Sequence, residues 1–551
     1  MKNPCWICAG LMILAFLGTG AGFSQPWGQG DISRPKESYN DLIQLFKEWR
    51  EFVKPKVVNG VPDYSAAEMI EQREELPAFQ KRLAAIDAGR WPVAQKIDYE
   101  LVRAEMNGLD FDHRVLRPWS RMPSFYMSVT DSEHDVPLRE GPEIHNPLEV
   151  WKHKFPLKVS EQAEFKAKLE AVPAILAQGK KNLTEEGKDL WKVSLPVIRS
   201  EVTTLENLAK LLAKHHPELV PATEKAKAAV GEFLSWAEKK EAAMKPAPCG
   251  VGVENFDWYM KNVHLVPYTW KEQRRILERE WERSMAALKL EEHKNRRLPA
   301  LSPPATEEEA RRRHNQAVDE FMKFLREEPV FTVPDYLGLD YFQGGFEPLG
   351  ARLDFFGRVE SLDPMPLKCH SMHWLDKQLM ARDPHPSPIR RVPVLYNIWD
   401  SRAEGLATAM EELMLQAGLF DKRPRGKELV YILLAMRCAR AMGDLMMHSN
   451  EWDLERSVKA GVERTPYGWL LPNGETVWTD LRIYLQQPGY GTSYVVGKVQ
   501  IDKLMAERAA QMGGGFTLQK FVDEFLGCGM IPVSLSRWEL TGLDDELRKM
   551  R

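Results

Sequence analysis

Cysteine is scarce in this sequence. The chain has 551 residues and six cysteines, and beyond residue 24 it has only Cys249, Cys369, Cys438 and Cys528. They have no paired spacing, which excludes a small disulfide-rich scaffold. One or two long-range disulfides remain open, as does a role for Cys369 as a metal ligand beside His370. A buried, unreactive thiol is the favoured interpretation of Cys369, since free cysteine packs as a small hydrophobic residue.

Long apolar runs are also missing after residue 24. No later segment approaches about 18 uncharged apolar residues, so no membrane-spanning helix is predicted. Residues 1–24 combine Lys2, an apolar run from Ile7 to Leu17 and several small residues, the pattern of a signal peptide. We therefore predict an exported protein, periplasmic or secreted. A soluble form is favoured over a lipid-anchored one, because Cys5 does not lie in a convincing lipoprotein motif.

Neither sign of charge dominates the sequence. The 75 Lys and Arg residues nearly balance the 79 Asp and Glu residues, which gives a net charge of −4. No basic stripe indicates a nucleic-acid partner, and no acidic tail indicates disorder. The expected partner is a peptide or small-molecule substrate, and the sequence leaves the oligomeric state open.

Strand-like alternation is rare and is limited to Val330–Val333 and Thr476–Val477. Apolar residues instead recur every three or four positions, the helical period. A helix is also expected after Thr306, where three glutamates follow and suit the positive end of a helix dipole. We predict a predominantly α fold with a central cleft and few short strands. The helical ranges are 38–54, 66–113, 147–215 and 219–245. Residues 269–294 are also predicted to be helical, because this run is long, densely charged and uninterrupted by glycine or proline.

Helical sequence is interrupted at Pro246–Val251 by Lys-Pro-Ala-Pro-Cys-Gly. This interruption predicts a helical N-terminal part, residues 36–245, and a C-terminal part, residues 250–545. Every candidate catalytic residue falls in the C-terminal part. We expect substrate to lie in the cleft between the two.

Two segments carry most of the chemistry, CHSMHWLD at 369–376 and EGLATAMEE at 404–412. His370 and His373 are three residues apart, so a continuous helix would place both on one face. A catalytic zinc site commonly takes its histidines from one helix and a carboxylate from a later helix. The sequence therefore predicts a metal site of His370 and Glu404 with either His373 or Asp376. Zinc is expected, and other divalent metals also accept such donors.

A general base is the missing part of this site. Ser371 follows the first histidine, where a zinc peptidase of this general kind carries a glutamate, and serine at its ordinary pKa cannot take a proton from water. Glu411 lies two helical turns after Glu404 and could act as the base or support the metal ligands. Asp376 is the other candidate base. His448 and Tyr494 are candidates to stabilise an oxyanion.

Simpler interpretations remain beside these. The two histidines could be ordinary core or surface residues. Glu404 and Glu411 could be salt-bridge partners of Arg402, Arg437 or Arg440, and His448 could pair with Asp444 within one helix. Tyr494 could be a core aromatic residue.

The C-terminal half resembles the large bacterial domain-of-unknown-function family 885, from about residue 330 to 540. Glu404 and Glu411 fall on the two glutamates of the family motif EGWALYAE, and further similarities follow in the same order. They are Arg440, Asp444, His448 and Trp452; Tyr484, Pro488-Gly489, Ser493-Tyr494 and Gly497; and residues 521–532.

This resemblance implies a helical zinc peptidase of the gluzincin type. The family motif HExxPGHH then aligns His370 with its first histidine, Ser371 with its glutamate and Asp376 at or next to its second histidine. Trp374 and Leu375 occupy the proline-glycine place, so the motif is altered. We predict an exported metal-dependent hydrolase, most simply a peptidase of short peptides. The alternative is an inactive family member that binds peptide or another small ligand in the inherited cleft.

Overall fold

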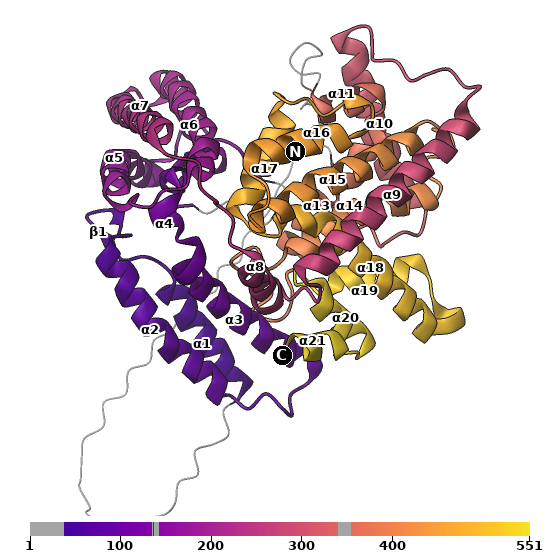
Figure 1. The fold of residues 1–551 in the computed structure, drawn as a ribbon, viewed down its shortest axis with the longest axis horizontal. Helices are drawn as coiled ribbons and strands as arrows, with labels where there is room; N and C mark the ends of the chain where they lie inside the picture. Colours follow the sequence, from indigo (N-terminus) through magenta and orange to yellow (C-terminus); the bar gives the residue numbers. More distant parts are fainter. Residues whose placement is uncertain (1–37, 135, 137–142, 340–353) are drawn as a thin grey trace, which may run out of the picture.

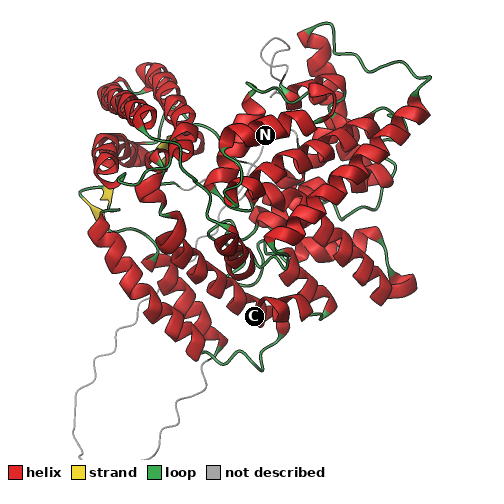
Figure 2. Cartoon of the chain, in the orientation of Figure 1, coloured by secondary structure: helices red, strands yellow, loops and turns green. Residues whose placement is uncertain are grey.

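The computed structural model describes residues 38–134, 136, 143–339 and 354–551 (Figure 1). The predicted signal peptide, residues 1–24, lies outside the described residues. The structure is 71% helical with only 2% strand, which confirms the predominantly α prediction (Figure 2). Among the described residues, no helix is long and apolar enough to cross a membrane.

Helices of the N-terminal part are joined by short turns and by two small strand pairs, β1 with β2 antiparallel and β3 with β4 parallel. The helices predicted at 38–54 and 219–245 correspond to α1 and α7. In chain order the elements are α1 (Tyr39–Phe52), β1 (Val57–Val58), β2 (Val61–Pro62), α2 (Ala66–Ala85), α3 (Val93–Phe111), the π-helical η1 (Asp112–Leu116), α4 (Pro118–Arg121), η2 (Pro123–Tyr126), β3 (Val129–Thr130), β4 (Leu148–Glu149), η3 (Val150–Lys152), α5 (Val159–Asn182), α6 (Lys188–His215), η4 (Pro217–Leu219) and α7 (Val220–Ala243).

Helices joined by irregular segments make up the described residues of the C-terminal part, which follows α7 after the predicted interruption at 246–251. Helix α10 begins after Thr306, as expected, and the Thr306 side chain accepts a hydrogen bond from the amide of Glu309. The elements are α8 (Val253–Tyr259), the π-helical η5 (Met260–His264), α9 (Trp270–Asn295), α10 (Glu307–Glu327), α11 (Phe355–Leu362), α12 (Met365–His370), α13 (Met372–Arg382), α14 (Asp400–Gln416), α15 (Gly426–His448), α16 (Leu454–Arg464), η7 (Pro466–Gly468), α17 (Glu475–Gln486), α18 (Tyr490–Met512), η8 (Gly513–Gly515), α19 (Leu518–Gly527), α20 (Val533–Thr541) and α21 (Asp545–Met550).

Both strand predictions are wrong. Residues 330–333 form an irregular segment after α10, and Thr476–Val477 lie in the first turn of α17. The amide of Thr476 donates to the carboxylate of Asp354, which satisfies one backbone group left open at a helix start. Val477 is fully buried on the apolar face of α17, so tertiary packing selects the helix over the local β preference.

Two glycines allow α14 and α18 to pack almost backbone to backbone. A Cβ atom on Gly497 would lie 2.1 Å from the carbonyl oxygen of Ser401, and one on Gly405 would lie 2.6 Å from the carbonyl carbon of Gly497. No side chain fits into this contact, which explains Gly497 by close packing rather than chemistry. The contact fixes α14, which carries Glu404 and Glu411, against α18, which carries Tyr490 and Tyr494.

The last helices of the chain return to the N-terminal part. The buried Arg390 side chain donates to Asp98 on α3 at 2.7 Å and to Glu539 on α20 at 2.6 Å. Arg551 forms a further ion pair with Glu100 on α3. The N-terminal and C-terminal parts are therefore joined along α3 as well as through the chain segment between α7 and α8.

We expect Gly497→Ala to destabilise the protein by about 1–3 kcal/mol, because the added methyl group must push two helix backbones apart. Gly231→Ala is the matched control, since a Cβ at this position of α7 would meet nothing within 4 Å. This control should be neutral or stabilise by up to about 1 kcal/mol. Thermal or urea unfolding of both variants measures the difference, and equal stabilities would contradict the close-packing explanation.

Candidate metal centre

The two histidines lie on either side of a helix break. Helix α12 ends at His370 and α13 begins at Met372, with Ser371 between them at ψ 6°. The expectation that one continuous helix carries both histidines is therefore wrong. The imidazole rings nevertheless remain 5.0 Å apart between their centroids, nearly perpendicular to each other.

Helix α14 brings Glu404 to these histidines. Nε2 of His373 lies 2.9 Å from a carboxylate oxygen of Glu404, and the side chains of both residues are buried. One nitrogen or oxygen atom from each of His370, His373 and Glu404 can be chosen so that all three lie within 4.8 Å of one another. In the part of the chain that the structure describes, these residues form a group of donors that could hold a metal ion. His370 is the partly accessible member, with 21% of its side chain exposed.

Glu411 and Arg437 orient the His370 ring. Nδ1 of His370 lies 3.0 Å from Glu411, and Arg437 donates two bonds of 2.6 Å to the same carboxylate. Arg437 also lies 3.2 Å from Nδ1, but the ionised carboxylate only accepts hydrogen bonds, so the proton is best placed on Nδ1. Nε2 then keeps its lone pair, as a metal-binding histidine requires.

Charges around the cluster favour the metal-binding forms of His370 and Glu404. Burial lowers the pKa of His370, and the neighbouring Arg437 lowers it further, so the ring is neutral near pH 7. Burial alone would raise the pKa of Glu404, but the contact with His373 and the hydrogen bond from the Tyr490 hydroxyl outweigh burial and lower this pKa to about 2. Glu404 is therefore a carboxylate, the form that coordinates metals.

Asp376 is not part of this group. Both of its oxygens accept hydrogen bonds from the guanidinium of Arg402, at 2.6 and 3.2 Å, and the two side chains are buried. Asp376, predicted as a candidate ligand and base, is therefore held in an ion pair between α13 and α14. That ion pair holds the helix of His373 against the helix of Glu404.

His448 and Tyr494 have different surroundings. Nε2 of His448 lies 2.8 Å from the carbonyl oxygen of Tyr484, and Nδ1 lies 3.4 Å from the amide of Val251. Both ring nitrogens thus have backbone partners, and the structure does not bring this residue to the metal cluster. The ring of Tyr494, by contrast, stacks against His370 with centroids 6.3 Å apart. Of the two residues predicted to stabilise an oxyanion, Tyr494 is therefore the one that lies beside the cluster.

Tyr490 is a site residue that the sequence analysis missed. Its hydroxyl donates to the second carboxylate oxygen of Glu404. Asp444 accepts hydrogen bonds from the amides of Gly489 and Thr492 and so stabilises the start of α18, where Tyr490 lies. The four-residue spacing of Tyr490 and Tyr494 on one helix was the available signal.

Cysteine chemistry takes no part in the site. Cys369 is fully buried, and burial raises the pKa of its thiol well above the ordinary value. All four described cysteines are free, so the long-range disulfides left open by the sequence do not form. The interpretation of Cys369 as a buried, unreactive thiol agrees with this geometry.

These features define a predominantly helical protein with a His-His-Glu cluster. Residues 373–539 match the model of a family described as bacterial protein of unknown function, DUF885. The match confirms the resemblance found in the sequence, and it includes His373, Glu404 and Glu411. It begins after His370 and Ser371, where the sequence departs from the family motif.

Two solved structures share this fold. A protein from Shewanella oneidensis, described as a predicted lipoprotein of unknown function, aligns with a TM-score of 0.64 at 14% identity and covers 91% of this chain and 99% of its own. A protein from Colwellia psychrerythraea, also described as a predicted lipoprotein, aligns with a TM-score of 0.63 at 15% identity and covers 92% of this chain and 97% of its own. No curated protein matches significantly in sequence. The structural likeness shows a common fold.

We expect His448 to make stability fall as the pH drops. Burial lowers its pKa from 6.5 to about 4, so the unfolded chain takes up a proton near pH 6.5 while the folded protein resists it. Its contribution, about 3 kcal/mol at most, is present above pH 6.5 and is lost towards pH 4.

Unfolding midpoints between pH 7 and pH 4 should therefore fall less in His448→Gln than in the wild type. His293→Gln, on the exposed end of α9, is the control and should follow the wild type. An unchanged pH dependence in His448→Gln would show that this histidine is not the group that titrates.

Proposed function

We propose that this protein is an exported, metal-dependent hydrolase that cleaves short peptides, with zinc held by His370, His373 and Glu404. The observation that carries the proposal is the convergence of these three donors within 4.8 Å. Catalytic zinc sites use three protein ligands of this kind and leave a fourth position for water. Manganese and other divalent ions also accept mixed nitrogen and oxygen donors.

The surroundings of the three donors fit a metal. The Glu411 carboxylate beside His370 Nδ1 is the partner that metal-binding histidines commonly have. Glu404 already carries a negative charge, and one of its oxygens faces His373 while the other accepts from Tyr490. Buried donors with fixed orientations bind a cation without first having to reorganise.

A bound divalent metal would supply the Lewis acid that lowers the pKa of water and polarises a peptide carbonyl. The protein groups have separate tasks in this proposal. Tyr494 lies against His370 at the edge of the cluster and donates its hydroxyl to the oxygen on which negative charge develops. Glu411 keeps the His370 ring in place through its pairing with Arg437, which is the second of the two roles considered for it.

Export is supported by the signal-like residues 1–24. The two similar structures are described as predicted lipoproteins, which agrees with a location outside the cytoplasm. Soluble periplasmic or secreted protein remains our proposal for this chain, because Cys5 lies outside a convincing lipoprotein motif.

Ligand binding without turnover is the second candidate function. Ser371 favours it, because its hydroxyl donates to the carbonyl oxygen of Leu367 and it replaces the usual glutamate base. The pairing of Glu411 with Arg437 also withdraws that carboxylate from the role of base. Under this alternative the inherited cleft binds peptide or another small ligand but does not cleave it.

Metal content and peptide hydrolysis together test the proposal. Purified wild type should hold close to one equivalent of zinc, measured by mass spectrometry of the metals, and should lose hydrolysis on chelation and regain it with zinc. His373→Gln should retain less than about a tenth of the metal, because one of three ligands is lost. His293→Gln, on the exposed surface of α9, should keep both metal and activity.

Full activity without metal would rule out the metal-dependent hydrolase. Bound metal without hydrolysis of any peptide in a mixed library would favour the second candidate. Recovery of hydrolysis in Ser371→Glu would then show that the base alone had been lost.

Glu411→Gln should weaken zinc binding by about 10–100-fold, the usual effect of removing a group that orients a metal-binding histidine. Glu412→Gln is a matched control, because Glu412 lies next to it on α14 and pairs with Arg283 and Lys498. Both changes remove a glutamate from an ion pair with arginine, but only Glu411 contacts His370. Competition with a chelator of known affinity measures the difference, and equal zinc affinities would refute the orienting role.

A further inference from the structure

The ring of Tyr494 is held by three neighbouring side chains. It lies parallel to the imidazole of His370, with 12° between the ring planes and 6.3 Å between the centroids. The ring of Tyr490, one turn earlier on α18, meets it nearly edge-on with centroids 5.9 Å apart. The guanidinium carbon of Arg440 lies 4.7 Å from the Tyr494 centroid. Since Tyr494 is also buried, these contacts define the orientation of its ring.

Arg440 is a buried cation on α15. Its guanidinium group pairs with the carboxylate of Asp480 on α17. Burial lowers the pKa of this guanidinium, but the nearby Asp480, Tyr484 and Tyr494 outweigh burial and raise it above its ordinary value. Arg440 therefore keeps its positive charge beside the Tyr494 ring.

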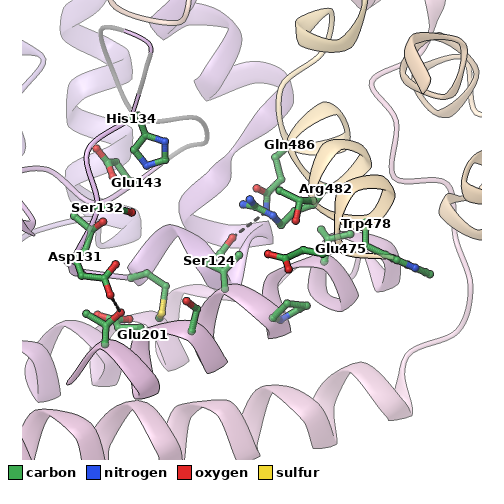
Figure 3. A pocket seen from close by; sticks show the side chains of 18 of the residues that line it. Ser124, Asp131, Ser132, His134, Glu143, Glu201, Glu475, Trp478, Arg482 and Gln486 are labelled. Carbon is green, nitrogen blue, oxygen red and sulfur yellow. Dashed lines mark hydrogen bonds between the residues drawn. The ribbon is translucent and has the colours of Figure 1, made fainter. Parts of the chain in front are cut away.

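Helix α17 supplies Asp480 from the side that faces the protein interior. Residues 475, 478, 482 and 486 of this helix line a cavity on its other side (Figure 3). Asp480 and Tyr484 do not line that cavity, because each is about half a helical turn away from those positions. Asp480 instead pairs with α15, and the Tyr484 ring stacks on Tyr490 of α18. The Arg440–Asp480 pair thus lies where α15, α17 and α18 meet.

Direct contacts therefore lead from α17 to the metal cluster. Asp480 holds the guanidinium of Arg440, and Arg440 holds the ring of Tyr494. Tyr494 in turn lies against His370 on α12. A cation within about 6 Å of an aromatic centroid is attracted to the ring, so Arg440 favours this position of Tyr494 over others.

The positive charge of Arg440 also acts on the Tyr494 hydroxyl. A cation beside the ring draws electron density away from the O–H group, which makes this group a stronger hydrogen-bond donor. A strong donor in a fixed position stabilises an oxygen that gains negative charge more than it stabilises a neutral carbonyl oxygen. Arg440 can therefore favour the transition state although it is itself buried and paired.

We propose that Arg440 is a positioning residue of the candidate site, which orients and polarises Tyr494 so that the tyrosine hydroxyl stabilises the oxyanion. This inference rests on the proposed function and assigns a residue that acts on the reaction only through Tyr494. Asp480 keeps the guanidinium in place. Because the effect is confined to developing charge, loss of Arg440 lowers kcat and leaves KM and zinc binding nearly unchanged.

The double variant Arg440→Met/Asp480→Asn tests this role, because it removes the cation without leaving a buried carboxylate unpaired. With a cleavable peptide its kcat should fall about tenfold, while KM and zinc content stay within about twofold of the wild type. Tyr494→Phe should lower kcat about 100-fold, as the loss of an oxyanion donor does. All three changes together should lower kcat no further than Tyr494→Phe alone, because Arg440 acts through that hydroxyl.

Two further variants separate this role from a general loss of stability. Arg440→Lys keeps a positive charge and should retain a higher kcat than the double variant. Arg537→Met/Glu507→Gln is the matched control, because Arg537 is also buried and pairs with α18 at Glu507, roughly 20 Å along the helix from Tyr494. The control should keep kcat within about twofold.

Three kinetic outcomes would overturn the inference. They are an unchanged kcat in the Arg440 double variant, an equal fall in the Arg537 control, and losses that multiply when Tyr494→Phe is added.

Fluorine NMR tests the positioning without zinc or turnover, with 3-fluorotyrosine in place of Tyr494. The fluorine resonances should be sharp with Arg440 present and should shift and broaden in the double variant, because the ring then samples more orientations. An unchanged spectrum would refute the positioning role even in an active zinc hydrolase. A changed spectrum in a protein that binds no zinc and cleaves nothing would remove the hydrolase and support the contact between Arg440 and Tyr494.

Discussion

Helix α14 buries several ionisable side chains, and three of them are compensated by other helices. Arg402 pairs with Asp376 on α13, Glu404 lies against His373 on α13, and Glu411 pairs with Arg437 on α15. Leaving one member of such a buried pair without its partner typically costs about 3–5 kcal/mol. The candidate site is therefore inseparable from the packing, because the contacts that satisfy these charges also set the positions of the surrounding helices.

The close glycine contact between α14 and α18 also helps to fix the position of Glu404. With Gly405 and Gly497 in contact, the first turn of α18 reaches Glu404 through the Tyr490 hydroxyl. A wider helix spacing would leave that oxygen of Glu404 without its donor. The close packing of the two helices and the hydrogen bond from Tyr490 thus constrain the same carboxylate.

Sequence predicted the helices and part of the cluster for clear physical reasons. Helices α1 and α7 follow from local apolar periodicity, and α9 follows from a long charged run without glycine or proline. His370, His373 and Glu404 follow from donor types at spacings that metal sites use. Spacing alone does not reveal that Arg402, from another helix, donates to both oxygens of Asp376. The sequence also does not reveal that His448 lies away from the cluster, because its backbone partners at Tyr484 and Val251 come from distant segments. The residues that complete the site depend on helix rotation and contact, which local patterns do not encode.

The tie formed by Arg390 between α3 and α20 has a consequence for movement. Its guanidinium holds Asp98 and Glu539 together, so the two halves cannot separate there without exposing a buried cation. The surfaces of α6 and α17 flank a cavity, and Gln486 on α17 donates a hydrogen bond of 2.9 Å between uncharged groups to Ser124 (Figure 3). Separating the two parts would therefore cost more free energy at the Arg390 end, where charged side chains would lose their partners.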